Sequence, residues 1–136
     1  DQIQSVDSVR LARTISQYTC GTGGQAGCLL EVNVSGEESK YGFTPEELTR
    51  EATEIAALSA MDWLGLMTIA PLAEAESSRP IFRQLAELKN SLADSFAGYQ
   101  WDQLSMGMTN DFEIAIEEGA TAVRVGQAIF GERISR

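Results

Sequence analysis

Short apolar runs alternate with longer segments of helical period along the sequence, and this alternation constrains the fold more than any other feature. The runs have the length and apolar content of strands, and the segments between them carry apolar residues every three or four positions. We expect strands at residues 3–7, 28–34, 64–70, 104–108 and 121–126. Strands that alternate with helices form parallel sheets through right-handed crossovers, and helices on the sheet explain strands that are apolar throughout. The sequence therefore predicts an α/β fold.

Capping signals mark where the expected helices begin. The sequence Thr44-Pro45-Glu46-Glu47 combines an N-cap Thr, a Pro at the first helical position and a Glu at the third, which predicts a capping box. Ser78 and Asn110 are the expected caps of two later helices, because short polar side chains accept hydrogen bonds from free helical N–H groups. Two more helical segments are expected at 8–18 and 127–130.

The length of 136 residues allows one domain but leaves two architectures for five parallel strands. They can form an open doubly wound sheet, or part of an eight-stranded (β/α)8 TIM barrel, which typically needs ~250 residues. The first residue is Asp1 and not Met. We expect about five of the eight strand-helix units of a barrel. The outer strands of such a piece are edges that pair with other chains, so self-association is expected.

The charge balance excludes several classes of partner. Ten Lys and Arg residues stand against 20 Asp and Glu residues, for a net charge of -10. Nucleic acid and anionic membrane surfaces both need a basic footprint, so neither is expected as the main partner. The apolar stretch 56–73 is interrupted by Asp62 and Pro71 and is too short to span a bilayer.

Residue types that are absent or scarce exclude several kinds of catalytic and metal site. The sequence has no His, which excludes His-based catalysis and His-ligated metal sites. Its two cysteines, Cys20 and Cys28, cannot build a four-Cys zinc site, and no Cys-dense framework or signal peptide indicates secretion. We expect two free thiols and a cytoplasmic location. The two lysines are Lys40 and Lys89.

The segment 21–26, GTGGQA, matches the dinucleotide fingerprint G-x-G-x-x-A. That fingerprint works when it leaves a strand and opens a helix, so that the helix N-terminus meets the pyrophosphate. Here the expected helix precedes the segment and the expected strand follows it. We therefore interpret the segment as a flexible loop and not as a cofactor site.

Arg124 lies between two valines in a strand that we expect to be covered on both faces. A buried guanidinium cannot lose its proton and needs an anion. Two partners are open: a carboxylate such as Glu31 or Asp111, or a bound phosphate or other acidic ligand. Glycine permits close approach of the backbone to an anion, and loops after the last barrel strands commonly hold phosphate. The predicted phosphate site combines Gly107 and Gly126 with the hydroxyl of Ser105.

Longer motifs resemble a known family. These are LLEVNVSGEESKYGF at 29–43, LMTIAP at 66–71, LSMGMTNDFEIAIEEGAT at 104–121 and VRVGQAIFGER at 123–133, together with SVDS at 5–8. In this order they are similar to the pyridoxal phosphate homeostasis protein family, whose single-domain barrel is related to the N-terminal domain of alanine racemase. The resemblance implies that residues 1–136 are the C-terminal part of one such domain, and that the cofactor is pyridoxal 5'-phosphate (PLP).

The resemblance also implies site residues. Ser105, Gly107 and Gly126 would surround the cofactor phosphate, with the backbone of Met106 and Gln127 close by and Arg124 as the cationic contact. Gln127 stands where many members have Ser or Thr. Tyr41 replaces a frequent His, which we interpret as a surface change.

Family members hold PLP through a Schiff base to a lysine at the end of the first barrel strand, and neither Lys40 nor Lys89 corresponds to it. We therefore expect non-catalytic binding of PLP in intracellular PLP homeostasis, without a stoichiometric covalent adduct, and a monomer or weak homodimer for a complete barrel. Two alternatives remain open. One is a relative of the fold-type III PLP-dependent racemases and decarboxylases, and the other is a phosphate-binding barrel that uses a sugar phosphate and no PLP.

Overall fold

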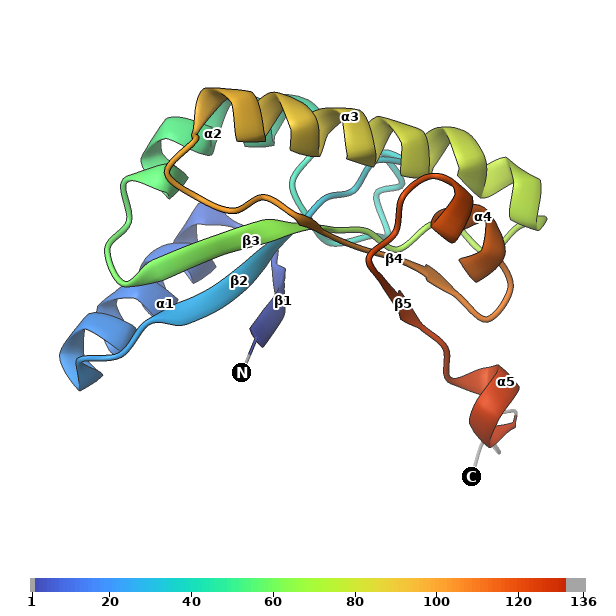
Figure 1. Cartoon of the computed structure of the whole chain (residues 1–136), viewed down its shortest axis with the longest axis horizontal. Helices are drawn as coiled ribbons and strands as arrows, with labels where there is room; N and C mark the ends of the chain where they lie inside the picture. The colour runs from blue at the N-terminus through green and yellow to red at the C-terminus, as the bar shows by residue number, and fades with distance from the viewer. Residues whose placement is uncertain (1, 132–136) are drawn as a thin grey trace.

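The computed structural model describes residues 2–131, which form one parallel sheet with helices against it (Figure 1). The strands are β1 (Gln2–Val6), β2 (Ala26–Glu31), β3 (Met61–Met67), β4 (Gln103–Met108) and β5 (Ala122–Arg124). The helices are α1 (Val9–Thr22), α2 (Pro45–Ala56), the 3₁₀ turn η1 (Ala75–Ser78), α3 (Arg79–Ser95), α4 (Phe112–Glu117) and α5 (Gln127–Phe130).

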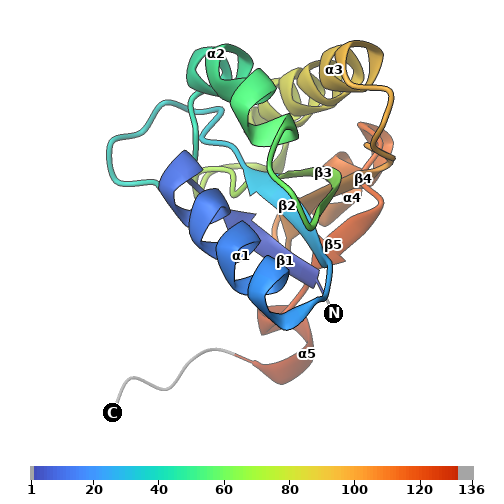
Figure 2. The same ribbon diagram turned by 90° about the vertical axis from the view of Figure 1, so that its left-hand side faces the viewer.

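The strand order decides between the two expected architectures. The strands lie in the order β1-β2-β3-β4-β5, and each neighbouring pair is parallel. A doubly wound sheet reverses its strand order at a switch point, whereas a barrel keeps its strands in chain order. Helices α1, α2 and α3 lie on one side of the sheet, as Figure 2 shows. The fold is therefore a half-barrel, and the prediction of a partial (β/α)8 barrel is confirmed.

The core lies between the sheet and these helices. Its largest fully buried side chains include Trp63 from β3 and Phe82 from α3, and the indole of Trp63 donates a hydrogen bond to the Ile55 carbonyl oxygen at 3.1 Å. Successive residues of a strand point to opposite faces. Leu104 and Met106 point into this core, so Ser105 between them points to the other face, which we call the inner face.

The predicted capping box is confirmed. The Thr44 side chain accepts a hydrogen bond from the Glu47 N–H at 3.1 Å, and the Glu47 carboxylate accepts one from the Thr44 N–H at 2.9 Å. The first helix begins as expected behind Ser8, whose hydroxyl accepts from the Leu11 N–H. This helix runs on to Thr22, past its expected end at residue 18, because the left-handed residue that closes it is Gly23 at φ 70°.

Other expected boundaries were wrong. The strand expected at 28–34 is β2 and ends at Glu31, and the strand expected at 64–70 is β3 and begins at Met61. At Gly65 a Cβ atom would lie 1.9 Å from the Gln103 carbonyl oxygen, so only glycine fits between β3 and β4. This requirement for close strand approach is invisible in a one-dimensional pattern.

The expectation that the strand of Arg124 is covered on both faces was also wrong. β5 has three residues, pairs with β4 alone among the described strands, and leaves Val123 37% exposed. Its partial exposure follows from its place at the edge of the sheet. Within residues 2–131, no helix combines the length and the apolar character that crossing a membrane requires.

Candidate functional site

A cavity of about 620 Å³ opens at the carboxyl ends of β3, β4 and β5. Its wall consists of Lys40, Arg124 and three segments: residues 69–73 after β3, residues 108–111 from the last residue of β4 onward, and part of residues 126–131, which include α5. Ligands of parallel α/β folds bind at this end of the strands, because the loops that follow them converge there. The cavity is therefore the candidate site.

The half-buried side chain of Arg124 lies in the cavity wall. It donates one hydrogen bond to the Ser105 hydroxyl at 2.7 Å and one to the Thr68 carbonyl oxygen at 2.8 Å. A guanidinium carries five N–H donors, so these two bonds leave donors for a ligand. Both acceptors are uncharged, and the guanidinium keeps its full positive charge.

The two carboxylates expected as partners of Arg124 lie near it, but neither pairs with it. Among residues 2–131, no ion pair joins Arg124 to a carboxylate. Burial lowers the pKa of the guanidinium, while Glu31 and Asp111 raise it through space. The pKa of the buried Glu31 carboxyl is itself raised, by burial and by Asp7, against an opposing effect of Arg124.

The loop after β4 is held by Asp111. Its carboxylate accepts hydrogen bonds from the Met108 N–H at 2.7 Å and from the Ser78 hydroxyl at 3.0 Å. Asp111 occupies the N-cap position of α4, so the prediction of Asn110 as the cap was wrong. Ser78 precedes α3 as expected, but its hydroxyl makes no capping bond because it is used by Asp111.

The structure separates the predicted site residues into two groups. Arg124, Gly126 and Gln127 line the cavity, whereas Ser105, Met106 and Gly107 are not part of its wall. Ser105 is fully buried on the inner face, and the Met106 side chain is fully buried in the core. The cofactor contacts implied for these six residues stay a prediction.

Glycine is present at positions 107 and 126 for different reasons. Gly107 has φ +92°, and a Cβ there would lie 2.6 Å from the Ala115 Cβ, so helix α4 could not pack on β4 as it does. At Gly126 a Cβ would meet open space. Packing therefore explains glycine at position 107 but not at position 126, which lies in the cavity wall.

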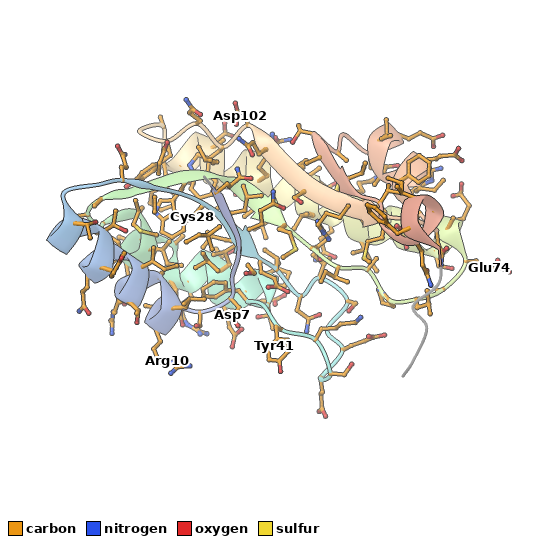
Figure 3. The ribbon with its side chains drawn as sticks, turned by 90° about the horizontal axis from the view of Figure 1, so that it is seen from below. Asp7, Arg10, Cys28, Tyr41, Glu74 and Asp102 are labelled. Carbon is orange, nitrogen blue, oxygen red and sulfur yellow. The ribbon has the colours of Figure 1, made fainter. Side chains whose placement is uncertain are left out.

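Sequence reasoning missed two parts of the cavity. Lys40 is not among the predicted site residues, yet it lies in the cavity wall. Residues 69–73 include no predicted site residue, although they lie just beyond the end of β3. In both cases the residues lie at or after the end of an expected strand in the sequence, and this position is the signal that could have identified them. Tyr41 projects outward from the loop beside Lys40, with 76% of its surface exposed (Figure 3).

The cysteines lie away from the cavity. Cys20 is exposed, Cys28 is buried, and both are free thiols. Figure 3 shows Cys28 among the core side chains. Burial, with a contribution from Asp62, raises the pKa of Cys28 to about 11. In the part of the chain that the structure describes, no group of three Cys, Asp or Glu residues could hold a metal ion.

Comparison with curated proteins identifies close relatives. Over 132 residues the chain is 45% identical to the pyridoxal phosphate homeostasis protein of Aquifex aeolicus, which covers 96% of this chain and 58% of the relative. The homeostasis protein of Vibrio cholerae is 39% identical, with 98% and 56% covered. The murine protein of the same name is 36% identical. The chain thus spans about half the length of the curated relatives that it matches.

Solved structures give the same result. PipY of Synechococcus elongatus, solved with PLP bound, superposes with a TM-score of 0.88 at 32% identity, covering 96% of this chain and 61% of PipY. Alanine racemase of Clostridium difficile, in complex with cycloserine, superposes with a TM-score of 0.69 at 23% identity, which shows the shared fold. The resemblance noted in the sequence is confirmed. The family described as alanine racemase, N-terminal domain, matches residues 1–134, and the chain belongs to this family.

Proposed function

We propose that this protein binds PLP in the cavity at Arg124 and takes part in intracellular PLP homeostasis without catalysing a reaction. One observation carries the proposal: Arg124 lines the cavity with a full positive charge, free donors and no carboxylate paired to it among the described residues. Lys40 adds a second positive charge to the same wall in a chain whose net charge is -10. This pair of cations suits a dianionic phosphate.

The rest of the cavity suits the ring of the cofactor. Small-molecule sites are concave and mostly apolar, with volumes of about 300–1,000 Å³. Ile69, Pro71, Leu72, Met108 and Phe130 contribute apolar surface to the wall. The wall residues therefore fit PLP, with Arg124, Gly126 and Gln127 as its proposed contacts. Relatives named for PLP homeostasis, and the PLP-bound structure of PipY, support the same ligand.

The proposal includes three further points. The absence of catalysis is supported by the homeostasis names of the relatives, while relatives with alanine racemase activity are more distant in sequence. A cytoplasmic location is supported by two free thiols, because cytosolic thiols stay reduced. We also propose that the chain is part of one barrel domain, since the family match spans residues 1–134.

Titration with PLP tests the proposal. Absorbance and fluorescence of the cofactor should report saturable binding, and inorganic phosphate should compete with it. Replacing Arg124 by Gln should weaken binding about tenfold, because a hydrogen bond to a charged group contributes ~1.5–3 kcal/mol. Arg50, an exposed arginine of α2, offers a matched control: Arg50→Gln should bind as the unmodified chain does.

Two results would contradict this proposal. Equal affinity for PLP in the unmodified chain and Arg124→Gln would return Arg124 to a structural role. Binding of inorganic phosphate or a sugar phosphate with no preference for PLP would favour a general phosphate-binding barrel.

A further inference from the structure

A continuous chain of hydrogen bonds crosses the inner face of the sheet and ends on Arg124. Arg124 Nη1 donates to Ser105 Oγ at 2.7 Å, and Ser105 Oγ donates to Gln4 Oε1 at 2.7 Å. Gln4 Nε2 donates to Gln2 Oε1 at 2.8 Å, and Gln2 Nε2 donates to Gln103 Oε1 at 2.6 Å. The chain thus joins β5, β4 and β1, strands that are far apart in the sequence.

Each hydrogen bond in this series has a defined donor and a defined acceptor. A hydroxyl has one hydrogen to donate and rotates to suit its neighbours. A guanidinium only donates, so Ser105 accepts from Arg124, and its own hydrogen goes to the Gln4 carbonyl oxygen. The amide of Gln4 is itself oriented, because its NH₂ group donates to Gln2. By accepting the Ser105 hydrogen, Gln4 fixes the direction of the Ser105 O–H bond, and with it the direction of the lone pairs that accept from Arg124.

Burial makes this arrangement specific. Ser105 is fully buried with Gln4 beside it, so its hydroxyl takes its hydrogen-bond partners from the protein. A buried polar group left without a partner costs ~1–3 kcal/mol, which favours the orientation that satisfies both bonds. Ser105 is also outside the cavity wall, while Arg124 is part of it. The Ser105 hydroxyl therefore has two partners within the protein: it donates to Gln4 and accepts from Arg124.

We infer that Gln4 is a positioning residue that acts through Ser105 to hold the Arg124 guanidinium in the orientation that binds an anionic ligand. This inference rests on the proposed function, because it takes Arg124 as the contact for PLP. It assigns a role to the first described strand, which contributes no residue to the cavity wall. It also makes Ser105 a residue that orients Arg124.

Three variants of the full chain test the inference. Gln4→Met keeps the length of the side chain but removes its amide, and Ser105→Ala removes the hydroxyl. Gln84→Met makes the same chemical change as the first variant at an exposed position of α3 and is the matched control. Affinity for PLP should fall about fivefold in Gln4→Met, as expected for the loss of one hydrogen bond. It should fall at least as much in Ser105→Ala and stay unchanged in Gln84→Met.

A double-mutant cycle separates positioning from a general effect on folding. If Gln4 acts through Ser105, Gln4→Met combined with Ser105→Ala should bind PLP no more weakly than Ser105→Ala alone. In an Arg124→Gln background, Gln4→Met should have no further effect. A fivefold loss that persists in both backgrounds would overturn the inference.

A measurement without any ligand keeps this test independent of the proposed function. Nitrogen-15 NMR of the arginine side chains reports rotation of the guanidinium, which two hydrogen bonds should slow for Arg124. Rotation should become fast in Gln4→Met and Ser105→Ala and stay slow in Gln84→Met. An unchanged Arg124 signal in Gln4→Met would refute the positioning role even if PLP binds. Failure of the unmodified chain to bind PLP, with the expected NMR changes, would refute only the proposed ligand.

Discussion

The Arg124 guanidinium donates a hydrogen bond to the Thr68 carbonyl oxygen at 2.8 Å, so a side chain of the edge strand β5 reaches past β4 to the end of β3. The Thr68 hydroxyl in turn donates to the Val32 carbonyl oxygen at 2.6 Å, beyond the end of β2. Arg124 thereby ties the short last strand to the ends of the strands beside it. The same side chain serves the edge of the sheet and the wall of the cavity.

Replacing Arg124 by Lys should therefore affect binding and stability together. Lysine keeps the charge, but its single ammonium group cannot reproduce the planar fork that reaches both Ser105 and Thr68. We expect a lower melting temperature and weaker retention of PLP than in the unmodified chain. Thermal unfolding followed by circular dichroism, with and without PLP, measures both. Full recovery of both properties by Arg124→Lys would show that charge alone matters.

Lys40 lies in the cavity wall, which makes it the lysine to examine for covalent chemistry. We expect borohydride treatment in the presence of PLP to give no one-to-one adduct at Lys40 or Lys89, because neither matches the family's Schiff-base lysine. Peptide mass spectrometry locates and counts any adduct. Stoichiometric labelling of Lys40 that is lost in Lys40→Arg would refute this expectation.

Glycine-to-alanine substitutions at 107 and 126 should give different results. Gly107→Ala forces a methyl group to 2.6 Å from the Ala115 Cβ at positive φ, and overpacking of this kind costs about 1–3 kcal/mol. Gly126→Ala meets open space and should unfold at the same denaturant concentration as the unmodified chain. Urea titration measures both. If Gly126→Ala weakens PLP binding without changing stability, position 126 acts through the ligand.

Glu31 should make stability depend on pH. Burial, with Asp7, raises its carboxyl pKa in the folded state, so the folded chain binds this proton more readily than the unfolded chain does. The charged carboxylate then lowers stability above that raised pKa, and protonation removes the cost as the pH falls. Glu31→Gln should raise the melting temperature at pH 8 and have little effect near pH 4. Glu38→Gln, at an exposed loop position, is the control. A gain of equal size at both pH values would mean that charge is not the cause.

The two cysteines should react at very different rates. The pKa of the buried Cys28 is raised to about 11, so its thiol stays protonated and inaccessible at pH 8, while Cys20 is exposed. A thiol reagent such as Ellman's should label Cys20 rapidly, and Cys28 only after denaturation. In Cys20→Ser the rapid phase should disappear. Rapid labelling that survives in Cys20→Ser would place Cys28 in reach of solvent.

The order of elements in this protein follows from sequence alone. Periodicity and local capping fix it, because the residues that form a capping box, such as Thr44 and Glu47, are neighbours along the chain. The six predicted site residues came from strand-end glycines, one arginine in an apolar strand and the family motifs. Three of them, Arg124, Gly126 and Gln127, proved to line one cavity.

Only the tertiary structure determined the features that depend on contacts between distant segments. It placed Lys40 in the cavity wall, gave Gly107 a packing role against α4, and joined Arg124 to Gln4 through a buried hydroxyl. No local pattern encodes these facts, because each depends on which strands become neighbours and on the face to which each side chain points. The sequence alone could predict that Arg124 needs an anion or an acceptor. The folded sheet determined which uncharged acceptors hold it and placed Arg124 in the wall of a cavity.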